Sequence, residues 1–129
     1  MKIYYKQIAG LFKSLADENR LKIIFNLAEG KKSVSKIVEE TGLSQPLVSH
    51  HLKELKHNHI VTTEREGSFV FYQLTEPAIV ALINLTNQLV VELSEKGNIF
   101  SPPASSPEFP FSAMMEKMMG IFSNLAGEK

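Results

Sequence analysis

The stretch that decides the fold is GLSQPLVSHHLKEL, which runs from Gly42 to Leu55. Glycine commonly follows the last turn of a helix, and serine commonly precedes the first turn, because its side chain accepts a hydrogen bond from a free backbone N–H group. Proline suits the first turn, where the N–H group that it lacks is not needed. Ser44 and Pro46 therefore predict a helix that begins just after a glycine turn. Its apolar side chains recur at helical spacing and are expected to face the core: Val48, Leu52 and Leu55.

The opposite face of this predicted helix is polar and contains no carboxylate. It consists of Gln45, Pro46, Ser49, His50 and Lys53, with Ser44 just before it. A helix that reads the major groove of DNA carries short side chains at its N-terminal end, which donate or accept hydrogen bonds at base edges. The free N–H groups of its first turn and a lysine side chain hold phosphates. A solvated surface has the same composition, so the interpretation depends on the rest of the chain.

A hairpin is predicted shortly after this helix. Two β-rich runs, 61–65 and 68–74, lie on either side of Glu66-Gly67, which is the pattern of two strands joined by a tight turn. Arg65 lies beside the tip, where its side chain can reach a neighbouring groove or phosphate. A hairpin with Arg65 beside its tip, next to a polar helix face, favours DNA binding over a merely solvated surface.

Short helices are also predicted before the deciding stretch. The first has an apolar face that extends from Tyr4 to Leu15. The second is capped by Asp17 and ends at Gly30, and the third is capped by Ser33. The side chains of the second helix that are expected to face inward are Leu21, Ile24, Phe25 and Ala28.

A longer helix is predicted after the hairpin. Thr75-Glu76-Pro77 is expected to cap it, and it extends to about Lys96. Its apolar residues lie on more than one face, so it needs a second partner, such as another subunit. The order of elements predicts a mainly α fold with a small β-hairpin, in the α+β class: a winged helix-turn-helix with flanking dimerisation helices.

Three segments resemble the ArsR family of bacterial and archaeal repressors. They are LADENRLKI at 15–23, the deciding stretch at 42–55 and EGSFVFYQL at 66–74, and the resemblance covers roughly residues 7–95. It implies a homodimer whose first and last helices form the dimer interface, and which binds a palindromic operator in double-stranded DNA to block transcription.

The resemblance also assigns roles to individual residues. In the family, the residues that match Gln45, Pro46, Ser49 and His50 lie at the DNA. A basic residue often follows the glycine of the wing, but Ser68 stands there in this chain, so wing contact is expected to rest more on Arg65. The full set of expected DNA-binding residues is Ser44, Gln45, Pro46, Ser49, His50, Lys53, Arg65 and Ser68.

The metal sites known from the family are not expected here. The thiolate site on the third helix uses Cys-x-Cys, and this chain has Ser33-Val34-Ser35 at those positions, whose hydroxyls are poor ligands for soft ions. A second site on the last helix needs Asp, His and Glu ligands, but no histidine follows His59. The four histidines between 50 and 59 point in different directions, so they are not expected to form a metal site either. We therefore expect no metal and no cofactor.

Composition excludes several classes of protein. The chain has 129 residues, 14 basic and 14 acidic, and no cysteine, which excludes disulfide-stapled modules, thiol enzymes and thiolate zinc sites. Eleven basic and eight acidic residues precede Glu76, whereas three basic and six acidic residues lie from Glu76 onward, so the DNA-reading half is basic. No catalytic motif is present, and we expect no enzyme. Without a signal-like or membrane-spanning apolar segment, we expect a cytoplasmic protein with no membrane partner.

The chain is expected to have three parts. Residues 1–97 form the winged helix-turn-helix and dimerisation domain, residues 98–112 form a Pro/Ser-rich linker, and residues 113–126 form a Met-rich amphipathic helix. That helix is a candidate to bind a protein or a small apolar ligand. The alternative function is a winged-helix module for protein–protein contact that does not bind DNA specifically; such domains usually carry apolar residues on the outer face, where this chain offers only Pro46 and Leu47.

Overall fold

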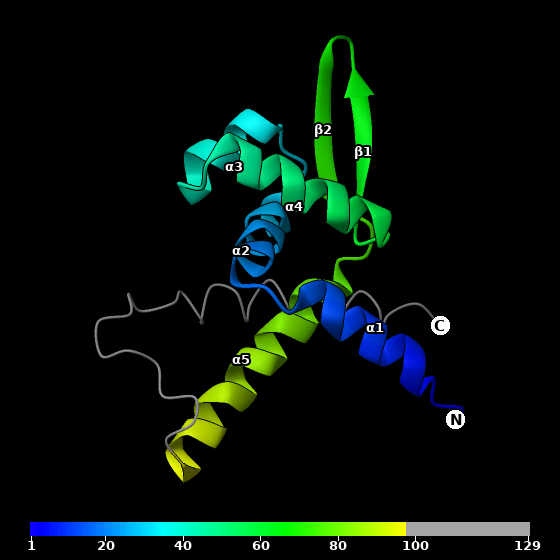
Figure 1. Cartoon of the computed structure of the whole chain (residues 1–129), viewed down its shortest axis with the longest axis vertical. Coiled ribbons are helices and arrows are strands. Elements are labelled where there is room, and N and C mark those ends of the chain that lie inside the picture. Colours follow the sequence, from blue (N-terminus) through cyan, green and yellow to red (C-terminus); the bar gives the residue numbers. More distant parts are fainter. Residues whose placement is uncertain (98–129) are drawn as a thin grey trace, which may run out of the picture. The chain divides into compact units, whose positions relative to one another are not determined.

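The computed structural model describes residues 1–97, which contain helices and one two-stranded antiparallel sheet (Figure 1). The elements are α1 (Tyr5–Leu15), α2 (Glu18–Asn26), the 3-10 turn η1 (Leu27–Glu29), α3 (Val34–Thr41), α4 (Gln45–His57), β1 (Val61–Glu66), β2 (Phe69–Leu74) and α5 (Ala78–Lys96). Met1–Glu76 form one compact unit, and α5 belongs to a second unit that begins at Pro77. The predicted fold, mostly helical with one hairpin, is confirmed. The predicted linker at 98–112 and the predicted helix at 113–126 lie outside the described residues.

Three predicted caps start three of the helices. Asp17 Oδ1 accepts hydrogen bonds from the backbone N–H groups of Asn19 and Arg20, at 2.9 and 3.0 Å. The hydroxyl groups of Ser33 and Ser44 each accept one from the third residue that follows. These bonds satisfy donors that the first helical turn leaves free, and so each helix begins where its cap lies.

The core of the first unit lies between α2, α3 and α4, which contact one another. Its buried apolar residues include Ile23, Ile24, Leu27, Ile37, Val48, Leu52 and Leu55. The prediction for the second helix was partly wrong, because Ile23 and Leu27 are buried while Leu21, Phe25 and Ala28 are only partly covered. The physical reason is twofold: α2 packs against both α3 and α4, and after Asn26 the chain tightens into η1, which turns Leu27 inward.

The C-terminus of α4 has no glycine, yet it ends in a Schellman motif. The N–H of Ile60 donates to the carbonyl of Leu55 at 2.9 Å, and the N–H of His59 donates to that of Lys56 at 3.1 Å. In this motif the residue just beyond the cap adopts the left-handed conformation, which usually selects glycine. Here that residue is His59, with φ of 60°.

The predicted cap of the last helix is wrong in one respect. The hydroxyl of Thr75 donates to the backbone carbonyls of His59, at 2.6 Å, and Ile60, at 3.0 Å, and it does not cap α5. The residue at the N-cap of α5 is Pro77, whose side chain makes no capping hydrogen bond. Through these hydrogen bonds, Thr75 connects the end of β2 to the turn after α4. No helix in the part of the chain that the structure describes is long and apolar enough to cross a membrane.

The hairpin is the wing of the fold, and its tip projects beyond α4 (Figure 1). Its register pairs Glu66 with Phe69 across a two-residue turn, and Gly67 at the first turn position has φ of 62°. A type II′ hairpin turn requires a positive φ at this position. The backbone N–H and C=O groups of Lys32 both bond to Tyr72 of β2, at 2.9 and 2.8 Å, and form an isolated antiparallel β-bridge.

Candidate nucleic-acid interface

The polar face predicted for the helix after Gly42 lies on the outer surface of α4. Gln45, Pro46, His50 and Lys53 are exposed and Ser49 is half-buried, whereas the apolar face of the same helix is completely buried. The side-chain amide of Gln45 donates to the Ser49 hydroxyl at 3.4 Å, so these two polar groups lie side by side. The face can donate and accept hydrogen bonds, and no carboxylate lies on it.

The N-terminus of α4 is open to solvent. Ser44 caps it by accepting a hydrogen bond from the N–H of Leu47 at 3.4 Å, and both Ser44 and Gln45 are exposed. Pro46 occupies the first turn, where it lacks only an N–H that the helix does not need. The remaining N–H groups of the first turn and the positive end of the helix dipole suit an anionic group such as a phosphate.

The wing carries the other predicted residues. Arg65 lies in β1 and Ser68 lies in the turn, and both are exposed. Because side chains alternate along a strand, Arg65 projects from the face of the hairpin opposite to Glu64 and Glu66. The wing therefore has one basic face and one acidic face, a division that was not predicted.

The acidic face of the wing is neutralised from outside the hairpin. Lys31, in the loop before α3, contacts the carboxylate of Glu66, and its Nζ lies 3.3 Å from Oε2 of Glu64. The hydrogen bonds that Lys31 donates to Glu66 and Glu64 raise the pKa of Lys31 above its usual range. The ammonium also lies 5.5 Å from the ring centroid of Phe71, close enough for a cation–π contact.

The next residue anchors the wing to the helices. The side chain of Lys32 is 9% exposed, and its Nζ lies 2.8 Å from a carboxylate oxygen of Glu29 and 2.8 Å from one of Glu40 on α3. Burial disfavours the charge of Lys32, but the hydrogen bonds to the two glutamates outweigh it and raise its pKa. The same contact with Lys32 lowers the pKa of Glu40.

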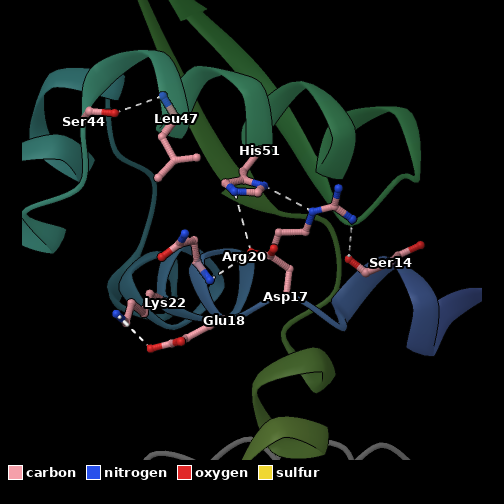
Figure 2. A network of polar contacts seen from close by, with 9 residues as sticks. Ser14, Asp17, Glu18, Arg20, Lys22, Ser44, Leu47 and His51 are labelled. Atoms are coloured by element: carbon pink, nitrogen blue, oxygen red, sulfur yellow. Dashed lines mark hydrogen bonds and ion pairs between the residues drawn. The ribbon is translucent and has the colours of Figure 1, made fainter.

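A third polar network connects α4 with the helix beneath it (Figure 2). His51 lies on the inner side of α4 and is 6% exposed. Its Nδ1 accepts a hydrogen bond from Nε of Arg20 at 3.3 Å, and its Nε2 lies 3.6 Å from Oδ1 of Asp17. Arg20 also donates through Nη1 to the carbonyl of Ser14 at 3.2 Å. The N–H of Arg20 at the helix start is the main reason that the pKa of Asp17 lies below its usual range.

Comparison with known proteins places this arrangement in one family. The family model described as "Bacterial regulatory protein, arsR family" matches residues 17–63, from the Asp17 cap into β1. The arsenical resistance operon repressor of Staphylococcus aureus is 34% identical over 93 residues, which cover 67% of this chain and 89% of the repressor. This chain belongs to the ArsR family. The membership confirms the expectation of a regulatory protein and not an enzyme.

Two further likenesses agree with this ArsR-family assignment. The transcriptional activator HlyU of Vibrio cholerae is 33% identical over 85 residues, 66% of this chain and 79% of the activator. A solved homodimeric winged helix-turn-helix DNA-binding domain from Mycobacterium bovis superimposes with a TM-score of 0.60 and 31% identity, covering 68% of this chain and 82% of that one. The winged helix-turn-helix fold of this ArsR-family chain is thereby confirmed.

Ser33 and Ser35, which were expected at the thiolate positions of the family, lie at the start of α3. Ser33 uses its hydroxyl to cap α3, at 3.2 Å from the N–H of Lys36, and Ser35 is exposed on the same helix. Among residues 1–97, no three His, Cys, Asp or Glu side chains lie close enough together to hold a metal ion. The two ring nitrogens of His51 contact Arg20 and Asp17, and His50 lies on the outer face of α4.

Sequence reasoning placed the outer face of α4 but missed the residues that support it. Arg20 contacts His51 across 31 positions of the sequence, Lys31 contacts Glu64 across 33, and Lys32 contacts Glu40 on the following helix. No local pattern reports such a pairing. One signal was available: a histidine on the apolar side of a helix requires a polar partner when it is buried, and His51 occurs on that side.

Proposed function

We propose that this chain is a homodimeric transcriptional repressor that binds an inverted-repeat operator in double-stranded DNA. In this proposal α4 reads the major groove through the residues from Ser44 to Lys53, and the wing contacts DNA through Arg65 and Ser68. The site of action is the cytoplasm. The family's usual metal sites do not control it.

The observation that carries the proposal is the division of α4 into two opposite faces. The inner face is buried apolar core apart from His51, and the outer face offers hydrogen-bonding groups with no carboxylate. An exposed glutamate or aspartate there would repel DNA, so its absence from the outer face favours a polyanionic partner. A partner helix would instead favour apolar side chains on that face.

Exposed apolar side chains support the homodimer. In the first unit, α1 leaves Ile8 at 41% and Phe12 at 51% exposed. In the second unit, α5 leaves Leu85 at 61% and Leu89 at 51% exposed. Two helices with uncovered apolar side chains fit a chain that buries them against a second copy. The similar M. bovis domain is homodimeric, which supports a dimeric state for this chain.

Independence from metal is supported by the chemistry of Ser33. Its hydroxyl already accepts a hydrogen bond from a backbone N–H, and a hydroxyl does not ionise at neutral pH as a thiol does. Addition of Zn²⁺, arsenite or Cu⁺ to a preformed complex of the full chain with DNA should leave its dissociation constant unchanged. Release of the DNA by any of these ions would overturn this part of the proposal.

The test of DNA binding is selection from a pool of random duplexes at two salt concentrations. We expect the full chain to enrich an inverted repeat with half-sites about 34 Å apart, or a small multiple of that distance. A reporter gene placed behind the enriched duplex should be repressed by the chain; activation would reverse the sign of the regulation and leave the DNA binding intact. Enrichment of no duplex at either salt concentration would favour the protein–protein interaction module.

The remaining part of the proposal concerns the segment that follows α5. Residues 98–112 serve as a linker and residues 113–126 as a Met-rich amphipathic helix that takes a protein or a small apolar ligand. Deletion of residues 98–129 should leave specific DNA binding intact. Loss of the dimer on this deletion would instead assign the segment to the subunit interface.

A further inference from the structure

The contact between Arg20 and His51 joins the recognition helix to α2 through directional bonds. Most of the inner face of α4 is aliphatic, and apolar contacts resist separation of two helices more than they resist rotation, because the hydrophobic effect has no direction. A hydrogen bond between a planar guanidinium and a ring nitrogen has a preferred geometry. Both ring nitrogens of His51 face groups at the N-terminus of α2, namely Arg20 and Asp17 (Figure 2).

The chemistry of Arg20 selects one form of the imidazole. A guanidinium N–H can only donate, so Nδ1 of His51 must present a lone pair to it. The single ring proton of neutral His51 therefore lies on Nε2, which faces the carboxylate of Asp17. Asp17 itself is held in its place as the cap of α2, and Arg20 is held from its other side by the carbonyl of Ser14.

We propose that Arg20 is a positioning residue for DNA recognition, which acts through His51 to set the rotation of α4 about its own axis. Side-chain tips lie roughly 5–6 Å from a helix axis, so a rotation of about 10° moves them by about 1 Å. The orientation of His51 also sets the direction in which the His50 side chain points, because successive side chains leave a helix about 100° apart. Its ring centroid lies 5.4 Å from that of His51.

This inference rests on the proposed DNA-binding function and extends it to residues that do not touch DNA. Loss of the directional contact should misplace Gln45, Ser49 and His50 relative to base edges, while phosphate contacts, which tolerate small shifts, persist. The expected signature is therefore a loss of specificity in a protein that remains folded. A residue with a merely structural role would lower stability and leave the ratio of specific to non-specific affinity unchanged.

The experiment compares two variants of the full chain with a matched control. Arg20→Met removes the donors, and the double variant Arg20→Met/His51→Leu replaces both partners of the Arg20–His51 bond by apolar groups, so that neither is left unpaired in the core. The other contacts of the pair, with Ser14 and Asp17, lie where water can replace them, because both residues are partly exposed. The control is Lys22→Met, which removes one positive charge from the same helix and only an exposed pair with Glu18, at 3.3 Å. The probes are the duplex that the wild type enriches from a random pool and a scrambled duplex of equal length.

Both Arg20 variants should bind the enriched duplex about tenfold more weakly, the scale expected for one mismatched base pair, with less than about threefold change for the scrambled duplex. Lys22→Met should change the ratio of the two affinities by less than about twofold. If the folded double variant keeps the wild-type ratio of affinities for the enriched and the scrambled duplex, the positioning role is wrong, and the proposed DNA binding is unaffected. If the wild type enriches no duplex, the proposed function fails, and the positioning role fails with it.

A spectroscopic measurement on the free protein tests the bond itself. The ¹⁵N chemical shifts of the His51 ring should show a protonated Nε2 and an unprotonated Nδ1 in the wild type and in Lys22→Met. In Arg20→Met they should shift toward a mixture of the two neutral tautomers. A wild-type ring with its proton on Nδ1, or a ring unaffected by Arg20→Met, would contradict the inference without any reference to DNA.

Discussion

The ammonium of Lys31 lies between Glu64 and Glu66, at 3.3 Å from Oε2 of Glu64, so that one lysine from the loop before α3 serves two carboxylates of the wing. The acidic face of the hairpin therefore carries a smaller net charge than its own sequence suggests. For a wing that approaches a polyanion, this neutralisation reduces repulsion without a contact between Lys31 and DNA.

Lys31→Gln should weaken DNA binding by roughly fivefold at low salt, because it leaves two carboxylates uncompensated within about a Debye length of the phosphates. The melting temperature should hardly change, because exposed ion pairs contribute little to stability. Fluorescence anisotropy titrations of the enriched duplex at low and at high salt measure the effect, which should shrink at the higher concentration.

The triple variant Lys31→Gln/Glu64→Gln/Glu66→Gln provides the matched control. It removes the two carboxylates together with their partner, so its affinity should return to within about twofold of the wild type. If the triple variant binds as weakly as Lys31→Gln, then Lys31 contacts DNA directly and the neutralisation argument is wrong.

His59→Gly should stabilise the protein by about 1 kcal/mol. His59 adopts φ of 60° at the Schellman position after α4, where a side chain is strained and glycine is not. Urea unfolding followed by circular dichroism measures the change. Lys56→Gly, within the last turn of the same helix, should lower stability by up to about 1 kcal/mol, since there glycine loses helix propensity. If both substitutions change the stability by the same amount, backbone strain at His59 does not explain the effect.

Glu40→Gln should lower stability at pH 7 and have less effect as the pH falls toward 3. The contact with Lys32 lowers the pKa of Glu40, so the unfolded chain binds more protons than the folded one in acid. The stability that this carboxylate contributes is present above the pKa of an unfolded glutamate, about 4.3, and is lost as the pH falls through the lower folded value. Urea midpoints between pH 7 and pH 3 should converge for the two proteins; parallel curves would contradict the assignment.

Gln45→Ala and Lys53→Gln should affect DNA binding in different ways. Loss of Gln45 should cost about 1–3 kcal/mol and relax base preference at one position of each half-site. Loss of Lys53 should weaken binding to all duplexes and reduce the salt slope by about 1 for each phosphate that is no longer neutralised. The wild-type slope of log K against log salt should be about −5 to −7 if each protomer of a dimer neutralises three or four phosphates. Repeating the selection with each variant distinguishes the two roles.

Local signals predicted much of the fold. Asp17, Ser33 and Ser44 start helices because a cap acts within three residues of its own position. The hairpin itself was predicted from its glycine turn, but its tip is Gly67-Ser68, one residue later than the predicted Glu66-Gly67. These features depend on neighbours in the sequence, and so the sequence reveals them.

Features that depend on distant partners were not predicted. The hydroxyl of Thr75 bonds back to His59 and Ile60, because the chain folds over to meet the end of α4, and a pattern read along the helix cannot show this. The pairing of Arg20 with His51 and that of Lys31 with the wing have the same cause. The outer face of α4 was predictable from helical spacing, whereas the contacts that support it became visible only in three dimensions.

Lys32 holds Tyr72 of the wing by its backbone and Glu40 of α3 by its side chain, so one residue ties the wing to the helix that packs against α4. The spacing of wing and recognition helix is set before any duplex arrives. Association then requires little ordering of the protein, which lowers the entropy that binding consumes. A wing without these contacts would have to be ordered at every encounter, whereas in the proposed complex this wing approaches the double helix already connected to α3 through Lys32.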